Sequence, residues 1–318
     1  MRYLGLLQTP VIIVADDLTG ACDAAVHFAA AGLRTEVSLD GSVPQAEVSA
    51  FSTDTRDSAD ETIRSRIRAI ASAVRPALVF KKIDSLLRGR PGFEISIAME
   101  AFGLETAVIT PAFPEMGRFV IGGQTVGVDV RSKLHADGLD TERCQILDAQ
   151  TNADLDEIVQ ANTSQHKVLW CGSGGLAMAL AKHLSKGAHI HPRKPNYGSV
   201  TFCIGSTHAA TTTQVRELPS STNVIPVDRN ATTAEEIRAM LAGPTPAALF
   251  ACGGDTATMI LNALGATSIT LIGEIVRGVP WGIMRGGIMD GVPVVTKSGG
   301  FGAPDTLIRV AAFFNQHE

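Results

Sequence analysis

The strongest constraint on the fold is a regular alternation of short β-branched runs with helical segments along almost the whole sequence. The runs are VIIVA at 11–15, TEVSL at 35–39, VSAFS at 48–52, ALVFKK at 77–82, TAVIT at 106–110, KVLW at 167–170, VTFCI at 200–204, NVIPV at 223–227, AALFA at 247–251, SITLI at 268–272 and VPVVT at 292–296. Amphipathic segments such as 20–31 and 59–74 lie between them. Strands separated by helices predict parallel sheets covered by helices on both faces.

The segment SKGAHIHPRKPNYGS, residues 185–199, interrupts this alternation with two prolines, two glycines and clustered basic residues. Such composition is typical of an interdomain linker. The chain of 318 residues also exceeds one ordinary domain of ~100 to 200 residues. We therefore predict an α/β protein with two doubly wound, mainly parallel-sheet domains, residues 1–190 and 198–318, and a cleft between them.

Composition excludes several classes of function. No run of about 18 apolar residues could span a bilayer, and the N-terminus lacks the cleavage site of a signal peptide. Five cysteines without Cys-x-x-Cys spacing are typical of buried thiols in a reducing cytoplasm. A net charge of -5 with only two Trp and two Tyr argues against a nucleic-acid surface. We expect a cytoplasmic protein with small-molecule ligands and no nucleic-acid or membrane partner; a homodimer stays open.

Three glycine-bearing turns follow strands of the second predicted domain. They are GSTH at 205–208, GGDT at 253–256 and KSGGFG at 297–302. Ligands of open α/β sheets collect at the carboxyl ends of strands, where helix N-termini present free N–H groups. One such turn alone is more often a tight turn with a helix cap. Three in one domain indicate a phosphate-bearing ligand, and a nucleotide fits best.

The third turn is close to a Walker A phosphate-binding loop but departs from it. The Gly that should precede Lys297 is replaced by Thr296, and Gly299 and Gly300 follow the lysine. We therefore expect residues 297–302 to form a loop after a strand that contacts the nucleotide without wrapping a phosphate. The alternative of an NAD-dependent oxidoreductase is disfavoured, because no G-x-G-x-x-G follows a strand with an acidic residue ~20 positions further on.

Charged residues follow the strands of the first predicted domain. They include Asp16, Asp17, Arg56, Lys82, Asp84 and Arg88. Charges directly after an apolar strand are costly unless they are paired or functional, so a surface ion-pair network is the alternative to a site. Arg56 and Arg88 can hold a small carboxylate bidentately, while aspartates accept hydroxyl hydrogens. The cluster suits a polyhydroxy acid.

Taken together, these segments resemble the four-carbon acid sugar kinase family, whose members phosphorylate D-threonate, D-erythronate or 3-oxo-tetronate with ATP. The resemblance covers essentially the whole chain and rests on ADDLTGACD (15–23), KKIDSLLRGRPGFE (81–94), PAFPEMGR (111–118), GSGGLA (172–177), GSTHAATTTQ (205–214), CGGDTA (252–257) and KSGGFG (297–302). It implies an N-terminal acid-sugar domain and a C-terminal nucleotide domain.

The resemblance also implies roles for individual residues. ATP contacts are expected from Ser206, Gly253, Gly254, Asp255, Thr256 and Gly300, with Lys297 and Gly299 in the same loop as the last of these. The acid-sugar pocket is expected from Asp17, Arg56, Lys82, Ile83, Asp84 and Ser85, with Asp16 beside them. Phosphoryl transfer requires mainly positioning and charge neutralisation. We expect Asp17 or Asp84 to orient or deprotonate the terminal hydroxyl, and Lys82 and Arg88 to hold the carboxylate or the migrating phosphoryl group. Mg²⁺ would bridge ATP oxygens, with a water-mediated contact to Asp255 and no metal site of the protein's own.

Two further expectations concern the acid-sugar site. Successive strand residues point to opposite sides, so one of Asp16 and Asp17 should cap the next helix or pair with a cation such as Lys82, while the other faces the cleft. The resemblance selects Asp17 as the residue that faces the cleft, which leaves the structural role to Asp16. The chain has Leu86 where the family usually has Thr, and residues 119–138 are compressed. A different small acid as acceptor, and a sensor that binds the acid without catalysis, therefore remain open.

Overall fold

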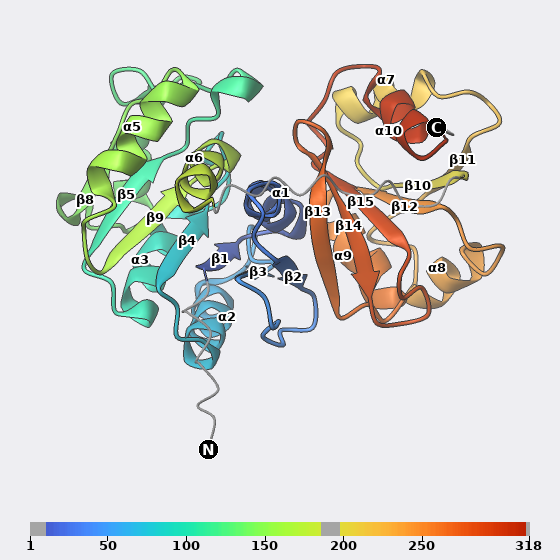
Figure 1. Cartoon of the computed structure of the whole chain (residues 1–318), viewed down its shortest axis with the longest axis horizontal. Coiled ribbons are helices and arrows are strands. Elements are labelled where there is room, and N and C mark those ends of the chain that lie inside the picture. Colours follow the sequence, from blue (N-terminus) through green and yellow to red (C-terminus); the bar gives the residue numbers. More distant parts are fainter. Residues whose placement is uncertain (1–10, 186–197, 316–318) are drawn as a thin grey trace.

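The computed structural model describes residues 11–185 and 198–315 as an α/β protein built on a 13-stranded sheet (Figure 1). The strands of the N-terminal half are β1 (Val11–Ala15), β2 (Thr35–Ser38), β3 (Val48–Ser52), β4 (Leu78–Lys82), β5 (Thr106–Thr110), β8 (Cys144–Ile146) and β9 (Val168–Gly172). Its helices are α1 (Leu18–Ala30), α2 (Asp60–Ala73), α3 (Pro91–Phe102), α4 (Val130–Ala136), α5 (Asn152–Asn162) and α6 (Gly174–Leu184). A small separate hairpin pairs β6 (Gln124–Thr125) with β7 (Val128–Asp129).

The C-terminal half supplies the rest of the sheet. Its strands are β10 (Val200–Ile204), β11 (Asn223–Pro226), β12 (Ala248–Cys252), β13 (Ser268–Val276), β14 (Val279–Arg285) and β15 (Pro293–Lys297). Its helices are α7 (Ala209–Arg216), α8 (Ala234–Met240), α9 (Gly254–Ala263) and α10 (Thr306–Asn315). The sheet order is β11-β10-β12-β15-β14-β13-β2-β3-β1-β4-β9-β5-β8. The expected mainly parallel α/β class is confirmed.

Each half has a point where the order of its parallel strands reverses. In the N-terminal half the chain moves from β1 to one side and later returns to place β4 on the other side. In the C-terminal half β10 likewise lies between β11 and β12. Crevices at the carboxyl ends of such strands are the usual ligand sites of doubly wound sheets. The topology therefore places one candidate site after β1 and β4 and another after β10 and β12.

An antiparallel hairpin joins the two halves into one sheet. Strand β13 pairs with β14 and β2, and β14 pairs with β15, all antiparallel. Strand β14 was not predicted, because VPWGIMR contains a proline and a glycine, which weaken a strand signal. The hairpin changes the architecture from two separate sheets to a continuous one.

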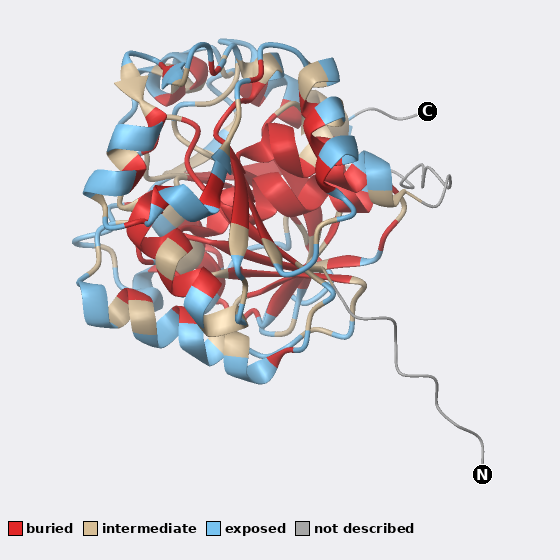
Figure 2. Cartoon of the chain, turned by 90° about the vertical axis from the view of Figure 1, so that its left-hand side faces the viewer, coloured by how far each residue is buried: buried red, intermediate tan, exposed pale blue. Residues whose placement is uncertain are grey.

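Helix α1 is the centre of the molecule. Every residue of α1 except Ala30 is buried, because α1 packs on β2, β3 and α6 of its own half and on β13 and α9 of the other. A mostly apolar helix is enclosed on all sides in this way, and here the polar Asp23 and His27 are enclosed with the apolar residues. Figure 2 shows buried residues through the middle of the molecule and exposed ones on the outer faces of the peripheral helices.

The remaining helices cover both faces of the sheet. In the N-terminal half α5 and α6 pack together beside α1, and α2 packs with α3 on the other face (Figure 1). In the C-terminal half α8 packs with α9, and α7 with α10. Most of the predicted linker, residues 185–199, lies outside the described residues, and the division at 190 and 198 stays a prediction. Within 11–185 and 198–315, no helix is long and apolar enough to cross a membrane.

Candidate active site

The three glycine-bearing turns of the C-terminal half lie against one another at the ends of β10, β12 and β15. A Cβ added to Gly205 would lie 2.0 Å from Thr256 Oγ1, and one added to Gly299 would lie 2.1 Å from Ser206 Oγ. A Cβ on Gly300 would meet His208 Nε2 at 3.3 Å. Only glycine permits such close approach of backbone to its neighbours. The turns therefore form one backbone-lined surface, next to the N-termini of α7 and α9.

Lys297 does not reach out of its loop as a Walker lysine does. The side chain is fully buried, and its Nζ donates to the carbonyl oxygens of Ser298 at 3.0 Å, Gly299 at 3.4 Å and Phe301 at 3.0 Å. Burial lowers its pKa. The ammonium thus holds the loop in shape from beneath. These hydrogen bonds show that Lys297 stabilises the loop. Its contact with the nucleotide stays a prediction.

The middle turn reaches across to the N-terminal half. Gly253 has a φ of 101°, a region that favours glycine, and Gly254 begins α9. A Cβ on Gly254 would lie only 2.9 Å from Asp17 Oδ2. The next residue, Asp255, is half-exposed and forms an ion pair with Arg229. The first turn of α9 therefore lies directly beside a carboxylate of the other half.

The structure corrects the expected roles of Asp16 and Asp17. Asp17 is the N-cap of α1 and accepts a hydrogen bond from the Gly20 amide at 2.6 Å. Asp16 instead accepts two hydrogen bonds from Arg56, from Nε at 2.7 Å and from Nη2 at 3.1 Å. The expected cap by Asp16 is wrong, because the backbone turns after Ala15 and gives the N-cap position to the second carboxylate. The expected cationic partner of Asp16 is found, but it is Arg56 and not Lys82.

The two neighbouring carboxyls differ in acidity. Burial alone would raise both pKa values, but Arg56 donates to Asp16 and, with Lys81 and Lys82 nearby, holds the pKa of Asp16 below its usual range. The pKa of Asp17 is raised, by burial and by the negative charge of Asp16, even though Arg56 Nη1 lies 3.0 Å from its Oδ2. Two titratable groups pushed apart in this way are typical of acid–base sites.

The loop after β4 carries another carboxylate, Asp84, which binds an arginine of its own loop. Asp84 accepts two hydrogen bonds from the Arg88 guanidinium, at 2.9 and 2.8 Å, and two more from the amides of Leu86 and Arg88. Burial alone would raise its pKa, but Arg88 together with Lys82 and Arg56 lowers it strongly. Ser85 and Ile83 beside it are buried. Asp84 is therefore an anion held by an arginine.

The two lysines that end β4 point to different partners. Lys81 is fully buried and pairs with Glu94 of α3 at 2.6 Å, so it links β4 to α3. Lys82 lies 3.7 Å from Asp23 of α1 and donates to the Ile83 carbonyl oxygen at 3.3 Å. The structure thus brings Asp16, Asp17, Arg56, Lys82 and Asp84 together after β1, β3 and β4, as predicted.

A cavity of about 960 Å³ lies away from this cluster. Its lining includes the amino ends of β4 and β9, whereas the charged cluster lies at the carboxyl ends of the strands.

Some residues that join the two halves near this site were not predicted from the sequence. Arg277, in the β13–β14 turn, pairs with Glu115 of the N-terminal half and with Glu274 of β13. Glu115 belongs to PAFPEMGR, a segment that was recognised without a role for the glutamate. The position of this charged residue shortly after β5 was the sequence signal that could have indicated a role for it. Arg277 offered none, because its position depends on the unpredicted strand β14.

Family models and curated relatives match both halves of the chain. Residues 11–133 and 126–180 match a family model described as a sugar-binding N-terminal domain, and residues 230–307 match one described as a nucleotide-binding C-terminal domain. The D-threonate kinase of Bordetella bronchiseptica is 31% identical over 395 aligned positions, covering 94% of this chain and 96% of the relative. The D-erythronate kinase of Heliobacterium modesticaldum is 26% identical, covering 93% of this chain and 94% of the relative.

Solved structures support the same fold. A Haemophilus influenzae protein of 18% identity has a TM-score of 0.69, covering 95% of this chain and all of that one. A Bordetella bronchiseptica protein of 27% identity, solved as a domain-swapped dimer with bound citrate, has a TM-score of 0.50 over 97% of this chain. The relatives define a sugar-acid kinase, and its two halves match the family models described as sugar-binding and nucleotide-binding. The chain belongs to the four-carbon acid sugar kinase family.

Proposed function

We propose that this chain is a cytoplasmic, ATP-dependent kinase that phosphorylates the terminal hydroxyl of a four-carbon sugar acid of threonate, erythronate or 3-oxo-tetronate type. The observation that carries the proposal is the approach of Gly254 to Asp17. It brings a helix N-terminus suited to phosphate against a carboxylate suited to a hydroxyl. Phosphoryl transfer needs donor and acceptor to meet in line at such a junction.

The nucleotide side of the proposal rests on the three turns. Backbone amides of Ser206, Gly253 to Thr256 and Gly300 would receive the phosphates, and Lys297 would keep the loop after β15 in its conformation. Mg²⁺ keeps several waters and needs only one or two carboxylates. The exposed carboxylate of Asp255 at the first turn of α9 fits that requirement. When bound, the ion would neutralise charge on the phosphate oxygens.

The acceptor side of the proposal selects Asp17 as the general base. A base must accept a proton near neutral pH, and Asp17 is the carboxyl of this cluster whose pKa is raised by burial and by Asp16. Asp16 and Asp84 are each bound bidentately by an arginine, and their pKa values are lowered. We assign Lys82 and Arg88 to the acid carboxylate or the migrating phosphoryl group.

The acceptor pocket is proposed to be smaller than in longer relatives. The alignment with the Bordetella kinase spans 395 positions, more than this chain contains, so that relative carries segments absent here. The sugar-binding family model matches in two pieces that overlap at 126–133, a stretch that runs from the turn of the β6–β7 hairpin through β7 into the start of α4. Loss of chain at this point would shorten the cover of the sugar-binding half and affect acceptor choice more than chemistry.

One assay distinguishes this proposal from its alternatives. ADP release would be measured with ATP and Mg²⁺ against D-threonate, D-erythronate, 3-oxo-tetronate and shorter acids, with an acid-free control. Acid-dependent ADP release supports the kinase. Acid binding in calorimetry without ADP release indicates a sensor, and acid-dependent NAD reduction without ADP release indicates an oxidoreductase.

The assignment of the two ligands to the two halves has its own test. Lys82→Ala removes a cation of the acid site, so it should raise KM for the acid at least tenfold and leave ATP affinity in calorimetry unchanged. A folded variant that no longer binds ATP would contradict the division. We also propose a homodimer, as in the domain-swapped Bordetella structure; light scattering of the pure chain measures it.

A further inference from the structure

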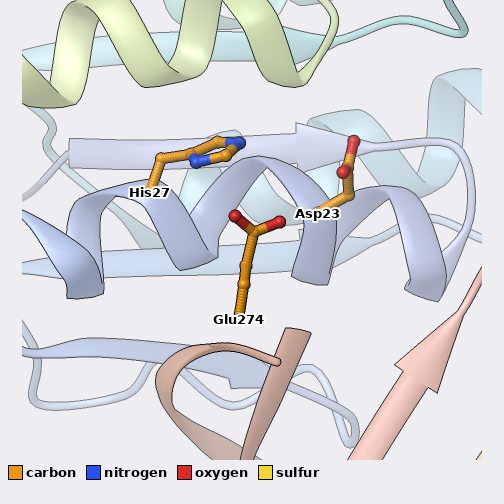
Figure 3. A group of neighbouring side chains, drawn as sticks. All are labelled: Asp23, His27 and Glu274. Atoms are coloured by element: carbon orange, nitrogen blue, oxygen red, sulfur yellow. The ribbon is translucent and has the colours of Figure 1, made fainter. Parts of the chain in front are cut away.

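A second group of polar side chains lies beside the acid site, between the two halves of the molecule. Asp23 and His27 are one turn apart on α1, and Glu274 projects toward them from β13 (Figure 3). One nitrogen or oxygen atom from each side chain lies within 4.8 Å of the others. The group combines an imidazole and two carboxylates, which is a donor set for a metal ion.

The structure leaves two atoms of this group unsatisfied. Asp23 and His27 are 4% and 5% exposed, so they are almost fully buried. Within residues 11–185 and 198–315, Asp23 Oδ1 and His27 Nε2 have no hydrogen-bond partner. A buried polar atom without a partner is costly, and native proteins rarely keep one without a reason. Two such atoms on adjacent turns of one helix face indicate a missing ligand.

We propose that Asp23, His27 and Glu274 form a binding site for a divalent transition-metal ion, with Zn²⁺ as the best fit. Imidazole nitrogen together with carboxylate oxygen favours Zn²⁺ over Mg²⁺ or Ca²⁺, which prefer oxygen donors alone. Three protein ligands leave a fourth position for water or a substrate oxygen. Two carboxylates balance the charge of the ion.

The neighbouring cations leave room for the ion. Lys82 approaches Asp23 through the other oxygen, Oδ2, and at 3.7 Å, so Oδ1 is free. Arg277 pairs with Glu115 as well as with Glu274, so it keeps a partner if Glu274 turns to a metal. Tetrahedral Zn²⁺ would require ligand atoms about 3.4 Å apart, so the side chains must close slightly.

The backbone of β13 also serves this site. Register shifts in the β13–β14 pairing lie on both sides of Gly273 and Glu274. Irregularities of this kind re-aim side chains next to functional sites. An ion held here would join α1 of the N-terminal half to β13 of the C-terminal half. One of its ligands, Asp23, also contacts Lys82 of the acid site. The site is separate from the Mg²⁺ that accompanies a nucleotide.

The test measures binding of the metal alone to the full chain. Chelator-treated protein is dialysed against Zn²⁺ for stoichiometry by elemental analysis, and titrated with Co²⁺ for its visible absorption. We expect one tightly held ion per chain and a tetrahedral-type Co²⁺ spectrum. His27→Gln and Asp23→Asn should each weaken binding at least tenfold and remove that spectrum, while circular dichroism confirms that the variants fold.

Two controls locate the ion. His135→Gln changes an exposed histidine of α4 and should bind as the unaltered chain does. The double variant His189→Gln/His191→Gln removes histidines outside the described residues and should also retain binding. Absence of a stoichiometric ion, or undiminished binding in both His27→Gln and Asp23→Asn, would overturn the proposal. Loss of binding only in the double variant would place the ion elsewhere and overturn it equally.

Discussion

Asp17→Asn separates two tasks that one carboxylate performs. Asp17 caps α1 by accepting from the Gly20 amide, and its other oxygen lies beside Arg56 and the first turn of α9. Asparagine is as good an N-cap as aspartate, because its side-chain oxygen can accept the same hydrogen bond. The substitution therefore keeps the helix start and removes the basic group.

The expected effect is large on turnover and small on stability. A positioned general base contributes ~10² to 10⁴-fold, so kcat should fall at least ~10²-fold, while KM for ATP changes little. The free energy of unfolding should change by less than ~1 kcal/mol, because the cap remains. Since a base must be deprotonated and Asp17 has a raised pKa, the acidic limb of the kcat profile of the unaltered enzyme should be absent from the residual activity of Asp17→Asn.

Asp16→Asn is the matched control on the adjacent residue. It weakens the bidentate bond to Arg56, so the free energy of unfolding should drop by ~1 to 3 kcal/mol with a smaller effect on turnover. Steady-state ADP release and urea unfolding of both variants decide the assignment. The reverse pattern would move the base to Asp16, and near-normal turnover in both would refute the reasoning and leave Asp84 as the candidate.

Three further outcomes are expected. Gly254→Ala places a Cβ 2.9 Å from Asp17 Oδ2, so kcat should fall about tenfold although alanine favours the helix by ~1 kcal/mol; an unchanged kcat with a raised melting temperature would show that this contact is not catalytic. Lys297→Met leaves loop carbonyls unsatisfied, so unfolding free energy should drop by roughly 3 kcal/mol and KM for ATP should rise, as measured by urea unfolding and ADP release; a stable variant with a normal KM would contradict the bracing role. Asp84→Asn removes a carboxyl whose pKa is lowered in the folded state by Arg88. In the unaltered chain this carboxylate stabilises the fold fully above about pH 3.8, and the stabilisation fades as the pH falls below that value. The variant lacks this contribution at every pH. The free energies of unfolding of Asp84→Asn and the unaltered chain should therefore approach one another progressively as the pH falls below about 4, and a constant difference would exclude this linkage.

Much of the fold could be predicted because its signals are local. The β-branched runs and their flanking helices identified most strands of the main sheet, with β1, β3, β5 and β10 at the predicted bounds. The strand β14 and the short strand β8 were missed, because proline and glycine in one and brevity in the other weaken the local pattern. The joining of two sheets into one depends on β14, and no local signal reports it.

The candidate site shows the same limit. Adjacent carboxylates after β1 and glycine turns after β10, β12 and β15 follow from strand ends, so their residues could be named in advance. The capping of α1 by Asp17 and the pairing of Asp16 with Arg56 could not, because Arg56 comes from the loop after β3 and the cap depends on the turn after Ala15. The inward direction of Lys297 likewise depends on the loop carbonyls that surround it.

The sequence by itself determined the class of the protein: a mainly parallel α/β chain with phosphate-suited turns in one half and charges suited to a sugar acid in the other. These properties depend on residue type and on short spacings, which can be read from the sequence without knowledge of the tertiary structure. Only the tertiary structure decided that Gly254 meets Asp17 and that Glu274 joins Asp23 and His27. Such contacts join residues far apart in the sequence, and their energies depend on burial and geometry that arise only when both halves close around α1.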